Sequence, residues 1–405
     1  MRGWRGRRSR VAEELADQPK GTAESRAEVS PGDEFVFTDE QQQLRAAVRK
    51  FCAERIDERA IRAVMEFDPP YDPAVWTRLG TELGVLGLAV PESAGGAGGT
   101  LIDQAVAIEE LGAALAPGPL VGTVYLAIPA LVAASAPSDL LDSLADGTRT
   151  AAFAIGDVAA APAGESWSLT GTVDGVIDAG AADLILVAAD GPDGTALFAV
   201  DTDSAGVQRV PLTTLDPTRP QATVTLSDAP AQLIAGPEDA DRVIAHALHV
   251  GSALLAVEQV GAAQHLLDLS VDYAKNRLQF GRPIGSFQAI KHKLADGLVA
   301  VEHARSTAYH AIWALAHGTD DPALAVSIAQ AVCSAALTRV ANDTIQVHGG
   351  IGFTWEHQAH LYYKRAYTNA ALLGSAEDHR ARVAELVLDA VTDTPGPRVA
   401  TGKPR

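Results

Sequence analysis

The sequence predicts an α+β protein in which an N-terminal all-α domain, a middle β-barrel domain and a C-terminal four-helix bundle follow one another. Three observations carry this prediction. Apolar residues recur at helical spacing over residues 35–147, short apolar runs between turns replace that period over 148–235, and long helical patterns fill 237–391. The period of the apolar residues is the main secondary-structure signal in a single sequence.

The N-terminal domain is predicted from helix signals at both ends of its apolar runs. Residues 38–41 read Thr-Asp-Glu-Gln, a capping box that starts a helix. Further helices are expected around 76–86 and 102–115, on either side of the glycine-rich stretch 87–99.

The middle domain is predicted to be a small barrel because its apolar runs are short and evenly spaced. Gly, Asp and Pro turns separate runs that recur about every 10 residues. The turn Gly-Pro-Asp-Gly at 191–194 indicates a hairpin. The expected strands are 151–155, 166–170, 184–188, 196–200 and 222–226.

The C-terminal domain is predicted to contain four long helices, at 239–276, 287–317, 321–348 and 358–391. These lengths well exceed the mean helix of globular proteins. Short loops between long helices are typical of an antiparallel bundle.

Composition narrows the class of protein. The chain has 405 residues, of which 47% are hydrophobic and 20% charged, and its formal net charge is −19. This balance excludes a disordered chain or a small disulfide scaffold. The acidic charge argues against nucleic-acid binding, which needs Lys and Arg to neutralise phosphates. The two cysteines, Cys52 and Cys333, lack CxxC spacing, so we expect reduced thiols and a cytoplasmic protein.

Both ends of the chain are predicted to be disordered tails, at 1–34 and 392–405, because they are polar and lack periodicity. Arginine-rich residues 1–10 are not followed by an apolar run, so we expect no secretory signal. No window offers the roughly 18 charge-free apolar residues of a membrane span, so no membrane association is expected.

Two segments of the C-terminal domain are unusual for a plain bundle. The first, 277–288, reads Arg-Leu-Gln-Phe-Gly-Arg-Pro-Ile-Gly-Ser-Phe-Gln. Arg277 could bind a pyrophosphate in bidentate fashion, Phe280 could cover an apolar ring, and Ser286 is expected to cap the next helix. Taken alone, an arginine at a helix C-terminus is commonly no more than a favourable partner of the helix dipole.

The second segment, 346–353, reads Gln-Val-His-Gly-Gly-Ile-Gly-Phe. Its glycines would let the backbone approach a ligand closely, and its N–H groups could bind an anion. A simple helix C-cap and turn is the alternative interpretation, because short glycine patterns are weak signals.

Taken together and in this order, the two segments resemble those of the acyl-CoA dehydrogenase family. The resemblance covers about residues 35–391, with further matches at 87–99, 109–112 and 273–281. The family fold consists of a helical domain, a β-domain and a four-helix bundle, as predicted above. The resemblance implies an acyl-CoA substrate, an electron-transfer flavoprotein as electron acceptor, and FAD bound across a subunit interface.

The resemblance also assigns residues to the cofactor. In the family, an RxxFG motif contacts the pyrophosphate and adenine half of FAD, and a QxxGG motif reaches the flavin held mainly by the neighbouring subunit. All six matching positions are present. They are Arg277, Phe280, Gln288, Gln346, Gly349 and Gly350.

Two other features of the family are absent. The β-domain segments that hold the flavin ring and the thioester correspond here to 154–162 and 175–180, which lack the expected hydroxyl and indole groups. The two usual positions of the catalytic glutamate hold Leu373 and Gly251. Losing a positioned general base lowers the rate by roughly 10²–10⁴-fold.

Another acid could replace the missing base. Glu258 lies two helical turns beyond Gly251 in apolar surroundings, and could act as a base, a hydrogen-bond acceptor or the partner of an arginine. Glu377 and Glu356 are weaker candidates. His357 and His360 lack further ligands at metal-site spacing, so no metal is expected.

The preferred hypothesis is that this chain completes the active site of a homologous partner subunit. It resembles the base-lacking member of actinobacterial α₂β₂ acyl-CoA dehydrogenases, which are associated with bulky substrates such as steroid side chains. The alternatives are a self-sufficient homomeric acyl-CoA or acyl-carrier-protein dehydrogenase that uses Glu258, a flavin oxygenase, and a non-catalytic relative.

Overall fold

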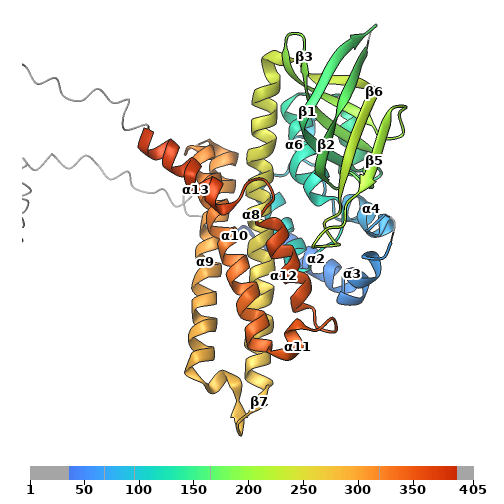
Figure 1. Cartoon of the computed structure of the whole chain (residues 1–405). Coiled ribbons are helices and arrows are strands. Elements are labelled where there is room, and N and C mark those ends of the chain that lie inside the picture. Colours follow the sequence, from blue (N-terminus) through green and yellow to red (C-terminus); the bar gives the residue numbers. More distant parts are fainter. Residues whose placement is uncertain (1–35, 68, 95, 165, 319, 390–405) are drawn as a thin grey trace, which may run out of the picture. The chain divides into compact units, whose positions relative to one another are not determined.

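The computed structural model describes residues 36–389, except 68, 95, 165 and 319. The chain divides into a first unit, Met1–Asp39, and a second unit, Glu40–Arg405. The predicted tails at 1–34 and 392–405 lie outside the described residues. The second unit carries the helices and strands of Figure 1.

The N-terminal part of the second unit is helical, as predicted. Several of its helices begin at side-chain caps: Asp57 and Asp72 each accept a backbone N–H, and Thr100 forms a capping box with Asp103. The elements are α2 (Asp39–Arg55), α3 (Glu58–Val64), α4 (Pro73–Thr81), η1 (Glu92–Ala94), α5 (Leu101–Ala113), the π-helical η2 (Leu120–Ala127), α6 (Ile128–Ala133) and α7 (Ser138–Ala145).

The middle part is a closed sheet, which confirms the predicted barrel. Its described strands run in the order β2-β1-β3-β4-β6-β5, and β2 also pairs with β6, which closes the ring. β1 and β3 are parallel, and the other pairs are antiparallel. The strands are β1 (Ala151–Ala163), β2 (Ser166–Ile177), β3 (Leu184–Gly191), β4 (Gly194–Asp201), β5 (Val207–Pro211) and β6 (Gln221–Ala235).

The C-terminal part is built on three long helices that pack side by side in Figure 1. Two of them are long and apolar enough for a membrane span by length and composition, but 72% and 61% of their most apolar windows are buried within the protein. Burial of this kind is typical of core helices. The long helices are α8 (Pro237–Asn276), α9 (Gln288–His317) and α10 (Pro322–His348).

The prediction of one continuous fourth helix over 358–391 is wrong. The chain instead forms α11 (Gly350–Phe353), α12 (Ala359–Asn369), α13 (Ala376–Ala384) and η4 (Glu385–Asp389). Leu373 and Gly374 have φ angles of 56° and 102°, which no helix tolerates. Ser375 then starts α13 through a capping box with Asp378.

The prediction that Ser286 caps α9 is also wrong. Between α8 and α9 the chain forms a small hairpin, β7 (Leu278–Gln279) and β8 (Arg282–Pro283), followed by the turn Ile284–Ser286. The N-cap position of α9 is Phe287, and the Ser286 hydroxyl donates to the carbonyl oxygen of Pro283 at 2.7 Å.

The N-terminal helices are joined to the bundle by close backbone packing. A Cβ atom on Gly112 of α5 would overlap the backbone of Glu258, and a Cβ atom on Gly261 of α8 would overlap the backbone of Glu109. Glycine at both positions therefore lets α5 and α8 approach each other closely.

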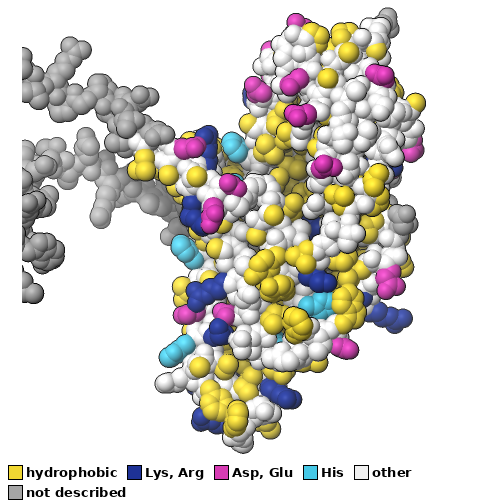
Figure 2. Space-filling model, viewed as in Figure 1, with side chains coloured by type: hydrophobic (Ala, Val, Ile, Leu, Met, Phe, Trp, Pro, Cys, Tyr) yellow, Lys and Arg dark blue, Asp and Glu magenta, His cyan; other side chains and the backbone are white. Residues whose placement is uncertain are grey.

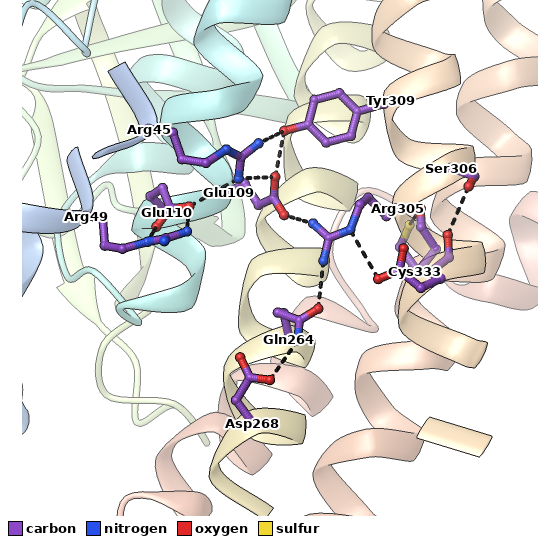
Figure 3. Close-up of polar contacts among 12 residues, drawn as sticks. Arg45, Arg49, Glu109, Glu110, Gln264, Asp268, Arg305, Ser306, Tyr309 and Cys333 are labelled. Atoms are coloured by element: carbon purple, nitrogen blue, oxygen red, sulfur yellow. Dashed lines mark hydrogen bonds and ion pairs between the residues drawn. The ribbon is translucent and has the colours of Figure 1, made fainter. Parts of the chain in front are cut away.

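Charged groups add to this junction (Figure 3). The Glu109 carboxylate pairs with Arg305 of α9 and with Arg45 of α2, at 2.9 Å for Arg45. Glu110 accepts two hydrogen bonds from Arg49, both at 2.8 Å. Both glutamates are nearly buried, so these contacts keep their charges compensated.

Candidate functional site

Residues 277–288 and 346–353, the two segments predicted to bind FAD, are called here the first and second clamp segments. The first forms the tip between α8 and α9. Arg277 directly follows the last turn of α8 and is exposed, and Gln288 is the first residue of α9. Phe280 is 90% exposed and has a φ of 54°, a strained conformation for an aromatic residue. Its ring meets the edge of Phe287, with centroids 6.1 Å apart. The hairpin thus presents a guanidinium and a phenyl ring to the outside.

The second clamp segment forms the end of α10. Gly349 has a φ of 61° and a ψ of −138°, which glycine adopts without strain. Its N–H donates to the carbonyl oxygen of Ile345 at 3.0 Å, which caps the helix. A Cβ atom on Gly349 or Gly350 would meet nothing within 4 Å, so the backbone of this turn is open to an approaching group.

The structure brings the two segments to the same end of the bundle. Tyr273 lies one turn before Arg277, and His348 directly precedes Gly349. The centroids of these two rings are 4.3 Å apart. β7 and α11 mark this end in Figure 1. All six residues predicted to clamp FAD are exposed there or at the adjacent start of α9.

Large apolar side chains are exposed around the clamp segments. Figure 2 shows hydrophobic and basic side chains together at the end of the molecule where Figure 1 places β7. Such a surface is typical of a protein–protein interface. The exposed apolar residues of the two segments and their neighbours are Leu278, Phe280, Ile351, Phe353 and Trp355.

These residues fit the nucleotide half of FAD. A guanidinium suits a pyrophosphate, an exposed phenyl ring suits an adenine, and open glycine N–H groups suit an anion. The predicted ring-holding stretch 175–180 does not fit the flavin ring. Ile177 and Ala179 are buried in the protein itself, and the carboxylate of Asp178 accepts the Gly122 N–H at 2.8 Å.

Leu373 borders a cavity next to α8, whereas the Cα of Gly251 faces Tyr125 and Leu126 of η2. Leu373 and Ser252, the neighbour of Gly251, line one cavity of about 360 Å³ between α8, α10 and α13. Neither position offers a proton acceptor. A Cβ atom on Gly251 would lie 2.6 Å from a methyl group of Leu126, so a larger side chain fits there only if Leu126 moves.

The other acids considered as replacements for the base are hydrogen-bonded or exposed. Asp378 lines the cavity, but its carboxylate accepts the N–H and hydroxyl of Ser375, and the side-chain hydrogen bond lowers its pKa. Glu377 and Glu356 are exposed, the former in the first turn of α13.

Glu258 is buried in a cluster of hydrogen bonds and ion pairs, with 1% of its side chain exposed. Its carboxylate pairs with Arg219 and accepts hydrogen bonds from the Tyr125 hydroxyl at 2.7 Å and Arg365 at 3.0 Å. Burial raises its pKa, but the two arginines outweigh this and lower the pKa to about 2. A carboxylate held in this way is a poor proton acceptor.

The cluster extends beyond Glu258. Arg365 also donates to Asp216 at 2.6 Å and to the Thr218 hydroxyl at 2.5 Å. Arg219 and Arg365 thus balance the charges of Glu258 and Asp216. Asp178 is a fifth buried charge nearby, and burial raises its pKa to about 6.

Sequence reasoning missed most of this cluster. The segment 216–219, Asp-Pro-Thr-Arg, has the composition of a turn between strands, and Arg365 lies within a helical pattern. The available signal was Glu258 itself, since a glutamate in an apolar helix needs a cationic partner if it is buried. The sequence does not say which arginine that is.

The two cysteines and the possible metal ligands do not form a reactive or metal-binding site in the described part of the chain. Cys52 and Cys333 are buried, and burial raises the pKa of each thiol to about 12, so neither is an available nucleophile. Over the described part of the chain, no group of three or more His, Cys, Asp and Glu side chains could hold a metal ion.

Comparison with known proteins places the chain in a family. Family models described as acyl-CoA dehydrogenase, N-terminal domain and C-terminal domain match residues 38–137 and 242–388. The chain is 38% identical to the acyl-CoA dehydrogenase IpdE2 of Mycobacterium tuberculosis, over 84% of this chain and 95% of that protein.

Solved structures agree in fold. A variant of the steroid acyl-CoA dehydrogenase (ACAD) Tcur3481-Tcur3483 matches with a TM-score of 0.80 and 31% identity over 87% of this chain and 99% of the other. The ChsE4-ChsE5 complex of Mycobacterium tuberculosis matches with a TM-score of 0.80 and 28% identity, over 89% of this chain and 100% of the other. The chain belongs to the acyl-CoA dehydrogenase family of FAD-dependent oxidoreductases.

Proposed function

We propose that this chain is the clamp-donating subunit of a heteromeric acyl-CoA dehydrogenase. In this role it holds the nucleotide half of an FAD whose ring is bound by a homologous partner subunit. The proposal is carried by the contrast between the residues that could bind FAD and those that could act as a base. The six clamp residues are exposed at or beside one end of the bundle, whereas both base positions lack an acid and Glu258 is tied to two arginines.

The assembly would catalyse α,β-dehydrogenation of an acyl-CoA thioester. FAD, when bound, supplies the acceptor for the hydride that leaves the β-carbon, and an electron-transfer flavoprotein would reoxidise it. The Arg277 guanidinium would pair with the pyrophosphate, and Phe280 would cover the adenine. Leu373 and Gly251 cannot take the α-proton, so the base would come from the partner.

Two relatives support the finer parts of the proposal. Both solved neighbours carry the names of two chains, Tcur3481-Tcur3483 and ChsE4-ChsE5, and the latter is named as a complex. The first is also named as a steroid ACAD. By analogy, a bulky acyl group such as a steroid side chain is the substrate class that we propose for the present assembly.

The self-sufficient alternative would use Glu258 as the base. Its burial, its two arginine partners and its lowered pKa argue against that role. The carboxylate would have to leave both ion pairs before it could accept a proton, and separating buried pairs costs several kcal/mol.

Flavin content tests the proposal directly. The chain would be purified alone and after co-expression with homologous chains encoded beside it, and the visible flavin spectrum recorded. We expect colourless protein alone and a yellow, active complex with the correct partner. In that complex, Arg277→Ala should lower FAD occupancy. Arg339→Ala, which removes an exposed arginine on the side of α10, should not.

The same experiment can also contradict the proposal. If the chain alone binds a full complement of FAD and dehydrogenates an acyl-CoA as an assembly of identical copies, the clamp-donor role is wrong. An oxygen-dependent product instead of an enoyl thioester would indicate a flavin oxygenase.

A further inference from the structure

His348 lies inside the second clamp segment, two residues after Gln346 and directly before Gly349. Its side chain points into the protein, and the residue is only 4% exposed. Its ring contacts those of Tyr273 and His357, with ring centroids 4.3 Å and 4.5 Å away and ring planes tilted by 30° and 51°. Since Tyr273 is one turn before Arg277, this stack of three rings joins the ends of α8 and α10.

Backbone contacts fix the tautomers of both histidines. His348 Nδ1 lies 2.8 Å from the Thr344 carbonyl oxygen, so this nitrogen carries a proton, and Nε2 is the nitrogen that can gain or lose one. His357 Nδ1 accepts the Ala359 N–H at 3.1 Å, so its proton is on Nε2. The His357 ring is therefore neutral in the observed arrangement, and the His348 ring is neutral when its Nε2 carries no proton.

Within the described part of the chain, no hydrogen-bond acceptor is placed to stabilise a second proton on His348. Its Nε2 is buried and lacks a hydrogen-bond partner among the described residues. The groups that face it are the Tyr273 ring from α8, the His357 ring after α11, and Gly352 of α11, where a Cβ atom would come within 2.8 Å of His348 Cβ. Burial lowers the pKa of His357, and the nearby His348 lowers it further; Glu58 of α3 raises this pKa and Arg62 lowers it.

We infer that His348 is a positioning residue of the FAD clamp, which it orders only in its neutral form. The inference rests on the proposed function, because it concerns the same clamp. With Tyr273 and His357, the neutral ring holds the Gly349 turn at a fixed place relative to Arg277. A protonated ring would put an unpaired charge into the stack, and the turn would separate from the end of α8.

The direction of the pH effect follows from the burial of the ring. Burial lowers the pKa of His348, so the ordered clamp binds a proton less readily than a released one, where the pKa is about 6.5. The ordering is complete above about pH 6.5 and is lost as the pH falls below it. For one linked proton, FAD affinity should fall by at most about tenfold per pH unit.

The experiment measures the FAD dissociation constant of the flavin-containing complex between about pH 8 and pH 5.5. Wild type should bind more weakly as the pH falls. His348→Phe keeps a ring in the stack but cannot be protonated, so its profile should be flat over the same range. His348→Ala should bind at least about tenfold more weakly than wild type near pH 8, and the difference should shrink as the pH falls, because wild type then loses the same ordering. His310→Phe removes an exposed histidine of α9 and should keep the wild-type profile.

A second measurement needs neither partner nor FAD. Hydrogen exchange at the amides of Gly349 and Gly352, which donate within this turn, reports its order in the chain alone. Protection should fall with pH below about 6.5 in wild type, after correction for intrinsic exchange, and should be independent of pH in His348→Phe.

The outcomes separate the two claims. If Arg277→Ala weakens FAD binding while His348→Phe keeps the wild-type pH profile or His348→Ala binds normally, the inference is wrong and the proposed clamp stands. If Arg277→Ala has no effect, the proposed function fails, and the exchange data alone decide whether His348 orders the turn.

Discussion

Glu258 of α8 and Arg365 of α12, 107 residues apart in the sequence, form an ion pair of 3.0 Å in which each side chain is 1% exposed. Arg219, from the segment before β6, pairs with the other oxygen of the same carboxylate. The Arg219–Glu258 pair thus ties the segment before β6 to the bundle, in a region that is closed to solvent, where breaking a charge pair is costly.

Glu258→Gln should destabilise the chain by about 3–5 kcal/mol, because it leaves two buried arginines short of a counter-charge. Chemical denaturation measures this loss. Glu302→Gln, which changes an exposed glutamate of α9, should change stability by less than about 0.5 kcal/mol. Normal stability with lost turnover in the complex would instead identify Glu258 as the base.

The charge of Asp178 should make the folded chain less stable at neutral pH than at acidic pH. Its folded-state pKa is raised from 3.8 to about 6, so its charge opposes folding near neutral pH, and protonation relieves that effect as the pH falls through 6. Asp178→Asn should therefore be more stable than wild type at about pH 7, by about 2–3 kcal/mol.

This advantage of Asp178→Asn should shrink between about pH 6 and pH 4, because wild type then becomes protonated at the same site. Denaturant midpoints of both proteins across this range measure the difference. A difference that stays constant with pH would show that Asp178 does not titrate in this way.

Gly251→Ala should cost about 1–3 kcal/mol, because its Cβ atom would lie 2.6 Å from a Leu126 methyl group. The double variant Gly251→Ala/Leu126→Ala should show a favourable coupling energy, since the smaller side chain makes room for the added methyl group. Gly180→Ala, where nothing lies within 4 Å, is the matched control. Additive losses would mean that Leu126 does not close this base position.

Phe280→Gly should leave the chain alone as stable as wild type or about 1 kcal/mol more stable. The phenyl ring is 90% exposed, and glycine adopts a φ of 54° without strain. The same change should weaken FAD binding by the complex, which flavin titration measures. Phe353→Ala, in an equally exposed aromatic residue, tests whether any loss of aromatic surface has this effect. A large loss of stability in the chain alone would assign Phe280 to folding.

The order of domains and most helices and strands could be predicted from the sequence, because apolar periodicity, caps and turn residues are local signals. The hairpin at 191–194 and the helix of the α8 segment are examples. The break within 358–391 had local signals, Gly374 and the capping-box pair Ser375 and Asp378, but the helical pattern on both sides favoured one continuous helix. Only the backbone shows a left-handed turn there.

The residues proposed to clamp FAD stand in two short contiguous motifs, so the sequence alone could point to them. Their meeting at one end of the bundle, and the ring stack that joins Tyr273 to His348, depend on how α8 and α10 pack. The partners of Glu258 likewise come from segments far apart in the chain. A sequence specifies which groups are present locally, but the neighbours of a buried charge are set by long-range packing, and only the tertiary structure reveals them.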